Sequence, residues 1–180
     1  MMPPEFKNWL ERVEVFNRRW LIKFETILHQ AEVGPTWMRD RRIAETVAET
    51  LRAPDGEAFR LDAYSVMSNH VHTIFKPFVS EANLQATRST DGHSLFISDY
   101  PGLSQIMHSV KGRGARECNV LLERTGQFWE HESFDHVIRP DKFDATLRYV
   151  LNSPVKAGLV RHWRDWPWNY CRKELYDKLN

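Results

Sequence analysis

The stretch that decides the fold reads FRLDAYSVMSNHVHTIFKP and spans residues 59–77. Apolar and polar residues alternate from Phe59 to Tyr64, which is the two-residue period of a β-strand. From His70 to Phe75 the chain is rich in β-branched residues and then meets Pro77, which favours a second strand. Because Ser68-Asn69 suits a tight turn, this stretch predicts a β-hairpin.

Helical periodicity flanks the hairpin on its N-terminal side. Residues 5–31 carry apolar side chains at intervals of three and four, which predicts a long amphipathic helix that Gly34-Pro35 ends. A second helix is expected to follow Asp40. After the hairpin, residues 80–94 are polar and aperiodic, so we expect a flexible loop there.

The C-terminal half predicts two further helices. The first begins near Leu103 and continues to a cap at Gly126, and the second begins with Asp141 as its N-cap and ends at Pro154. Residues 128–129 and 136–138 between them resemble short strands. Long helices and a few strands joined by short turns predict an α+β protein, with an antiparallel sheet and helices packed on one face.

The composition is that of an ordinary soluble globular protein. The chain has 180 residues, which suits a single domain over residues 1–180. No apolar run approaches the roughly 20 residues needed to cross a bilayer, so no membrane partner is expected. Two cysteines and a start without an apolar secretory core predict a cytoplasmic protein. The net charge of +1 neither indicates nor excludes nucleic acid.

The first candidate site is the pair His70 and His72. Side chains two residues apart on a strand point to the same face, so both imidazoles could share one divalent metal. The alternative is two partly exposed histidines on a sheet surface without a ligand.

The second candidate is Tyr149. The apolar residues of its predicted helix cluster in one sector, and Tyr149 falls about 145° from the centre of that sector. We therefore expect its ring to face a cleft, a partner or solvent; an ordinary surface tyrosine is the alternative. Asn152 and Ser153 follow by three and four residues, so they neighbour Tyr149 on the helix and could offer an oxygen to a metal.

Basic residues gather in two stretches of the chain. Within Lys111-Gly112-Arg113-Gly114, glycines beside cations could let the backbone approach phosphates, although such clusters are also common in surface turns. The other members of the two stretches are Arg116 and Arg124 in the first, and Lys156, Arg161, His162, Arg164, Arg172 and Lys173 in the second. A solvated surface is the simpler interpretation of both.

Several motifs are similar to those of one protein family. The hexapeptide Met67-Ser68-Asn69-His70-Val71-His72 resembles the Met-Pro-Asn-His-Val-His signature of the single-tyrosine HUH transposases. The chain resembles more closely their REP-associated tyrosine transposase branch, which is related to insertion-sequence enzymes. The further matching segments, in the family's order, are residues 128–130, 134–139, 149–160 and 166–170, so the resemblance covers roughly residues 34–172.

The resemblance implies the HUH endonuclease fold, a ferredoxin-like antiparallel sheet with both histidines on a central strand. It also implies His70 and His72 as metal ligands and Tyr149 as the nucleophile. The family carries its third ligand four residues after the tyrosine, usually as Asn or Gln. Here that position is Ser153, with Asn152 just before it. Family members also open with a strand, whereas this chain opens with the predicted helix.

The implied activity is the nicking and rejoining of single-stranded or hairpin DNA through a 5′-phosphotyrosine, with Mg or Mn as the divalent metal. Under this interpretation the phosphate contacts are Lys111, Arg113, Arg116, Arg124, Arg139, Lys156 and Arg161. Two alternatives are a DNA-hairpin binding protein that does not cleave and a small metal-dependent hydrolase. The sequence leaves the choice between a monomer and a homodimer open.

Overall fold

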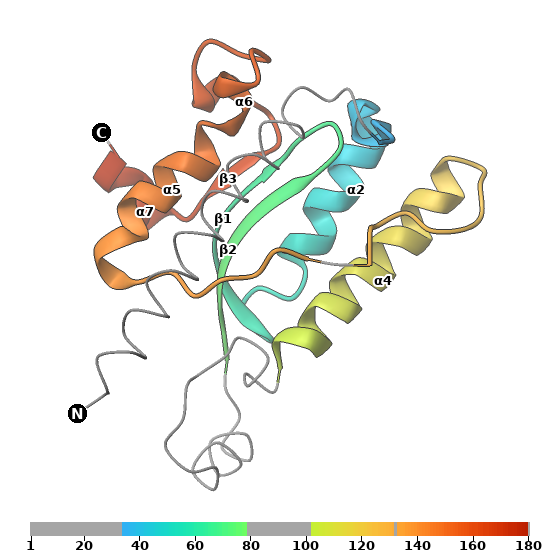
Figure 1. The fold of residues 1–180 in the computed structure, drawn as a ribbon, viewed down its shortest axis with the longest axis horizontal. Helices are drawn as coiled ribbons and strands as arrows, with labels where there is room; N and C mark the ends of the chain where they lie inside the picture. Colours follow the sequence, from blue (N-terminus) through green and yellow to red (C-terminus); the bar gives the residue numbers. More distant parts are fainter. Residues whose placement is uncertain (1–33, 79–101, 132, 180) are drawn as a thin grey trace, which may run out of the picture.

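The protein is an α+β fold built around a three-stranded antiparallel sheet of order β2-β1-β3 (Figure 1). The computed structural model describes residues 34–78, 102–131 and 133–179. The predicted helix over residues 5–31 and the predicted loop over residues 80–94 lie outside these ranges. No helix in the described ranges has both the length and the apolar character needed to cross a bilayer.

The predicted hairpin is confirmed. Strand β1 (Phe59–Val66) pairs antiparallel with β2 (Val71–Pro77). The backbone N–H of Met67 donates to the carbonyl of His70 at 2.9 Å, which closes the turn between the strands. In the resulting register His72 lies opposite Ser65. His72 therefore belongs to β2, and His70 is the last residue of the turn before it.

The other neighbour of β1 is β3 (Asn169–Cys171), a short strand that the sequence analysis did not predict. It follows the Trp166-Pro167-Trp168 segment, whose tryptophans meet edge to face. Because β1 lies between β2 and β3, the histidine strand is an edge of the described sheet. The family resemblance had implied a central strand for the histidines.

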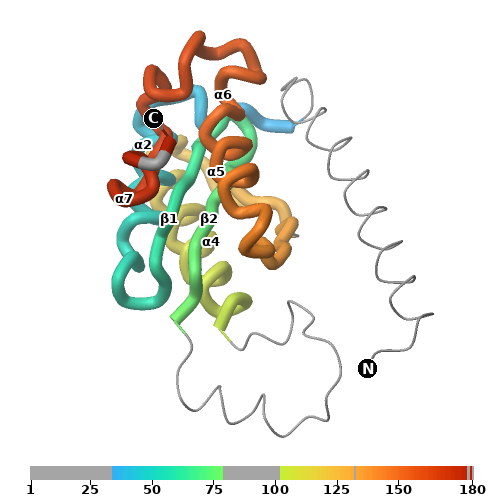
Figure 2. Tube along the Cα trace, turned by 90° about the vertical axis from the view of Figure 1, so that its left-hand side faces the viewer, coloured from blue at the N-terminus to red at the C-terminus, as the bar shows by residue number. Residues whose placement is uncertain are grey.

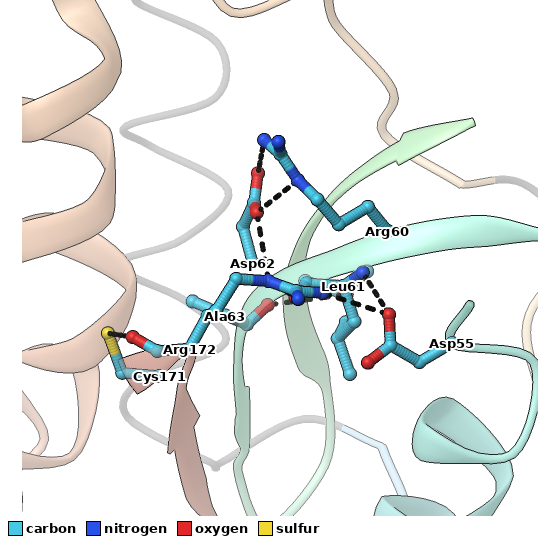
Figure 3. A network of polar contacts seen from close by, with 8 residues as sticks. Asp55, Arg60, Leu61, Asp62, Ala63, Cys171 and Arg172 are labelled. Atoms are coloured by element: carbon cyan, nitrogen blue, oxygen red, sulfur yellow. Dashed lines mark hydrogen bonds and ion pairs between the residues drawn. The ribbon is translucent and has the colours of Figure 1, made fainter. Parts of the chain in front are cut away.

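An irregularity in β1 assigns its residues to both faces of the sheet. Leu61 pairs with Phe75 and Ala63 pairs with Ile74, so Asp62 has no partner in β2 and forms a β-bulge. The side chains of Leu61 and Ala63 therefore face opposite layers. Figure 3 shows the polar network at this bulge. The Asp62 carboxylate is 3% exposed and accepts from Arg60, while the Arg172 guanidinium donates to the Leu61 carbonyl at 2.8 Å and to Asp55 at 2.9 Å.

Helices cover both faces of the sheet, so the prediction of helices on one face is wrong. Helix α2 (Arg41–Arg52) packs against one face, with α4 (Leu103–Leu121) beside it, and α5 (Phe143–Leu151) packs against the other (Figures 1 and 2). The first layer buries apolar side chains such as Ile43, Leu61 and Tyr64. The second buries Ala63, Ile74, Leu147, Val150 and Leu151.

The two helices of the first layer begin and pack for local reasons. The Asp40 side chain accepts from the backbone N–H of Arg42 at 2.9 Å, which confirms the predicted start of α2. Helix α4 contains Gly114 at its contact with α2, where a Cβ atom would lie 3.4 Å from Thr50 Oγ1. Helix α4 ends at Leu121, before a residue with positive φ, Glu123, so the predicted cap at Gly126 is wrong.

Helix α5 of the second layer begins later along the chain than the sequence predicts. Residues 140–142 form a 3-10 turn, and α5 begins at Phe143 without a capping side chain, so Asp141 is not its N-cap. Residues 128–129 and 136–138 are coil; the predicted strands there are wrong because short β-prone runs form strands only where they find a partner. The remaining described elements are η1 (Trp37–Arg39), α6 (Ser153–Lys156), η4 (Trp163–Asp165), α7 (Lys173–Tyr176) and η5 (Asp177–Leu179).

Candidate metal and tyrosine site

The two histidines converge at the β1–β2 turn. Their Nε2 atoms lie 3.1 Å apart, and the rings meet edge to face at 4.8 Å between centroids. Both side chains are half-buried. The expectation that they share one face therefore describes their placement correctly, even though His70 precedes the strand.

The side chain of Asn69 contacts the His70 ring at Nδ1, the nitrogen that does not face His72. Its Oδ1 atom lies 2.8 Å from His70 Nδ1. A carboxamide oxygen can only accept a hydrogen bond, so a hydrogen bond in this contact requires the hydrogen on Nδ1, and a neutral imidazole then has its lone pair on Nε2. That lone pair is directed to the side on which His72 Nε2 lies.

The pair fits a divalent cation that accepts imidazole ligands. Two nitrogens bound about 2.1 Å from one metal lie roughly 3.0–3.4 Å apart, which matches the observed spacing of 3.1 Å. Within residues 34–78, 102–131 and 133–179 no group of three or more His, Cys, Asp or Glu side chains could hold a metal. The donor set described here is therefore His70 and His72, and the other coordination positions would fall to oxygen donors such as water or a phosphate.

Helix α5 brings Tyr149 to this pair from the second layer. The ring of Tyr149 meets the ring of His72 edge to face, with 5.8 Å between centroids. The side chain is half-buried and packs at the margin of the apolar cluster, rather than clear of it as the sequence indicated. The phenol and the two imidazoles thus form one cluster, although they come from distant parts of the chain.

A lysine completes the cluster on the tyrosine side. Lys156 Nζ lies 3.6 Å from the centroid of the Tyr149 ring, which is a cation–π contact. Lys156 ends the short helix α6, which follows α5 after Asn152. The exposed Lys156 therefore places a positive charge over the face of the phenol ring, where an anionic ligand would be attracted.

The predicted oxygen ligands are placed less favourably. Ser153 is fully buried, and its hydroxyl donates to the backbone carbonyl of Tyr149 at 3.0 Å. The Asn152 amide donates to the carbonyl of Arg148 at 2.8 Å. Both side chains thus bond backbone carbonyls of α5 where it meets α6. No described hydrogen bond joins either of them to the histidine pair.

The predicted phosphate-binding residues do not form one surface. Lys111 Nζ donates to the carbonyl of Glu130, Arg113 pairs with Glu117, and Arg124 bonds Asn119 and stacks on Trp37. With exposed Arg116, these four belong to α4 and the segment after it, in the layer opposite α5. The others are exposed: Arg139, which lies 3.8 Å from Asp141, then Arg161, and Lys156 at the cluster.

A separate pocket lies elsewhere in the described part of the chain. It has a volume of about 650 Å³ and lies between α4 and residues 126–135, with Met107, Phe128 and Trp129 among its lining. It contains neither the histidines nor Tyr149. The imidazoles and the phenol of the histidine cluster are half-buried outside this pocket, and their chemistry is the stronger indication of function because imidazole, phenol and ammonium groups converge there.

Two features of the cluster were missed by sequence reasoning. The sequence motif includes Asn69 but assigns it no role, because its contact with His70 depends on the conformation of the turn. Lys156 was assigned to phosphate binding, but its stacking on Tyr149 depends on the break between α5 and α6.

The chain has no significant match among protein-family models, curated proteins or solved structures.

Proposed function

We propose that this protein is a metal-dependent enzyme that nicks and rejoins single-stranded DNA through Tyr149. The observation that carries the proposal is the contact of Tyr149 with His72, whose Nε2 atom lies 3.1 Å from that of His70. A phenol beside a two-imidazole donor set is suited to phosphoryl transfer to tyrosine. The motif resemblance to the REP-associated tyrosine transposases supports the same activity, with hairpin or palindromic DNA as substrate.

The architecture is compatible with the HUH endonuclease fold that the proposal entails. The antiparallel sheet carries His72 on β2, with His70 directly before that strand, and the tyrosine helix α5 packs on the face that His72 shares. Localisation in the cytoplasm and action as a monomer or homodimer remain part of the proposal.

The cleavage step uses the residues of the cluster in distinct roles. The bound divalent ion, Mg or Mn, would polarise the scissile phosphate and offset its negative charge. His70 and His72 would hold that ion, and Lys156 would bind a phosphate oxygen next to the phenol. The Tyr149 oxygen attacks phosphorus and loses its proton to solvent, while the bond from phosphorus to the 3′-oxygen breaks and that oxygen takes up a proton.

The products define the second half of the reaction. One DNA end is linked to Tyr149 through its 5′-phosphate, and the other end is a free 3′-hydroxyl. That hydroxyl can attack the phosphotyrosine, which restores the phosphodiester and the phenol. Because one phosphoester replaces another in each step, no nucleotide cofactor is consumed.

A labelled hairpin oligonucleotide tests the proposal. With Mn²⁺ or Mg²⁺ present, the protein should retain a label at the 3′ end of the cleaved strand under denaturing conditions, and should not retain a label at its 5′ end. Tyr149→Phe should abolish the adduct, because the ring remains but the nucleophile is lost, and it should keep hairpin binding. Tyr170→Phe serves as the matched control and should form the adduct normally. A wild-type protein that yields no adduct with either metal would contradict the proposal.

A non-cleaving hairpin-binding protein is the second candidate. It is favoured by Ser153, whose hydroxyl is buried and donates to a backbone carbonyl at the position where the family carries a metal ligand. This candidate predicts tight hairpin binding without an adduct. The third alternative, a hydrolase that uses a metal-activated water, predicts nuclease activity that survives Tyr149→Phe.

A further inference from the structure

Only one of the two histidines lies on a strand. His72 is held by the pairing of β2 with β1, whereas His70 precedes β2 and its backbone only closes the turn. The strand ladder therefore does not by itself set the direction of the His70 ring. Asn69 Oδ1 lies 2.8 Å from His70 Nδ1, the ring nitrogen other than the one that faces His72.

We propose that Asn69 is a positioning residue that fixes His70 as the Nδ1–H tautomer and thereby turns the Nε2 lone pair toward the shared metal position. This inference rests on the proposed metal site and concerns a residue outside it. The Asn69 amide does not contact the ion, because its oxygen is occupied on the opposite side of the imidazole ring.

The geometry explains why this contact matters. An imidazole binds a metal through a nitrogen that carries no hydrogen, so a neutral His70 must hold its hydrogen on Nδ1 if Nε2 is the ligand. Without an acceptor at Nδ1 the hydrogen is free to occupy either nitrogen. With Asn69 in place, His70 Nε2 accepts, and His72 Nε2 donates across the 3.1 Å contact until an ion replaces that hydrogen. Partners of this kind typically change metal affinity about 10–100-fold.

The first readout is the tautomer of His70 in protein without metal. Long-range ¹H–¹⁵N correlation spectra of ¹⁵N-histidine-labelled protein, at a pH where imidazole is neutral, should show the hydrogen on Nδ1. In Asn69→Ala the signals should shift toward a mixture of both tautomers. Asn69→Asp keeps an acceptor at this position and should retain the Nδ1–H form.

The second readout is the affinity for Mn²⁺ alone, measured by calorimetric titration. Asn69→Ala should bind about 10–100-fold more weakly than the wild type, whereas Asn69→Asp should bind at least as tightly. Ser68→Ala, one residue earlier in the same turn, is the control and should match the wild type. If Asn69 only shaped the turn, Asn69→Asp would not restore the Mn²⁺ affinity that Asn69→Ala loses.

The outcomes separate this inference from the proposed function. If the wild type binds Mn²⁺ and Asn69→Ala binds it equally well, or if His70 carries its hydrogen on Nε2, the role of Asn69 is refuted while the metal site stands. If the wild type and His72→Ala show the same lack of Mn²⁺ binding, the metal site itself fails, and the tautomer spectra still test the contact between Asn69 and His70.

Discussion

At the scale of single residues, Tyr149 is held between an imidazole and an ammonium group. His72 meets the edge of the phenol ring, and Lys156 lies over its face. A cation–π contact with an exposed lysine contributes about 0.5–1 kcal/mol, which is enough to favour one ring orientation. In the proposed reaction the same lysine binds a phosphate oxygen next to the phenol.

Lys156→Met should reduce the rate of adduct formation with a hairpin oligonucleotide by about tenfold or more, because a charge-assisted contact of roughly 1.5–3 kcal/mol is lost. Lys156→Arg keeps both the charge and the stacking and should stay within a few-fold of the wild type. Single-turnover rates at saturating DNA measure the effect. Equal rates for the methionine and wild-type proteins would show that Lys156 does not contact the reacting phosphate.

The residue pattern predicted the site only in part. The two-residue period of a strand predicted that His70 and His72 share a face, and their Nε2 atoms do lie 3.1 Å apart, although His70 precedes β2. Tyr149 was singled out by its helical position. The directions of Asn69 and Lys156 could not be predicted, since each depends on a turn or a helix break. Ser153 was offered as a ligand, yet its hydroxyl bonds the carbonyl one turn back, a local option that the sequence does not distinguish.

At the scale of elements, the glycines of α4 differ in their surroundings. A Cβ atom at Gly112 would meet nothing within 4 Å, whereas one at Gly114 would meet Thr50 at 3.4 Å and Trp129 at 3.6 Å. Gly112→Ala should raise the free energy of unfolding by about 0.5–1 kcal/mol, as expected for an exposed helix position. Urea denaturation measures the change.

The matched substitution Gly114→Ala should give a smaller gain or none, because the added methyl group crowds Thr50. Gly114→Leu should destabilise by about 2 kcal/mol or more, since α2 and α4 would have to separate. A leucine variant as stable as the wild type would show that this helix contact adapts freely.

The bulge network of β1 predicts unequal effects for the two arginines beside Asp62. Arg172→Met should lower the free energy of unfolding by about 2 kcal/mol, because it removes a partner of a buried carboxylate and leaves the Leu61 carbonyl without its donor. Arg60 is a half-exposed partner of Asp62, so Arg60→Met should cost less than about 1 kcal/mol. Urea midpoints that fall equally for both variants would contradict this ranking.

Element types were easier to predict than their arrangement. The hairpin and α2 follow from strong periodicity and from the capping side chain of Asp40. The sequence does not show that β1 changes face at Asp62, because Leu61, Asp62 and Ala63 fit a regular alternation equally well. The short strand β3 was also missed, since its three residues form a strand only by pairing with β1.

At the scale of the whole molecule, both layers contain a thiol that resists ionisation. Burial raises the pKa of Cys118 to about 11 in the first layer and that of Cys171 to about 11 in the second, where the Asp62 charge adds to the effect. Burial likewise raises the pKa of the Tyr64 hydroxyl. In the unfolded chain a thiol has its ordinary pKa of about 9.

Stability should therefore fall under alkaline conditions. The thiols' contribution is fully present below about pH 9 and is lost as the pH rises toward 11, because the unfolded chain releases protons that the folded chain retains. Urea denaturation across this range should show the decline, and Cys118→Ala should show a shallower one. A stability that stays constant to pH 11 would contradict the raised pKa values.

The extra residue in β1 has a consequence for how sequences of this kind can diverge. Deleting Asp62 would make Leu61 and Ala63 direct neighbours on opposite faces, so the ladder would become regular while the other side chains keep their layers. Loss of this one residue should therefore be tolerated better than loss of a residue from a regular strand, where a shift by one position moves side chains to the other layer. We expect related chains to differ by this residue in the spacing between the start of β1 and the histidines, while Leu61 and Ala63 keep their layers.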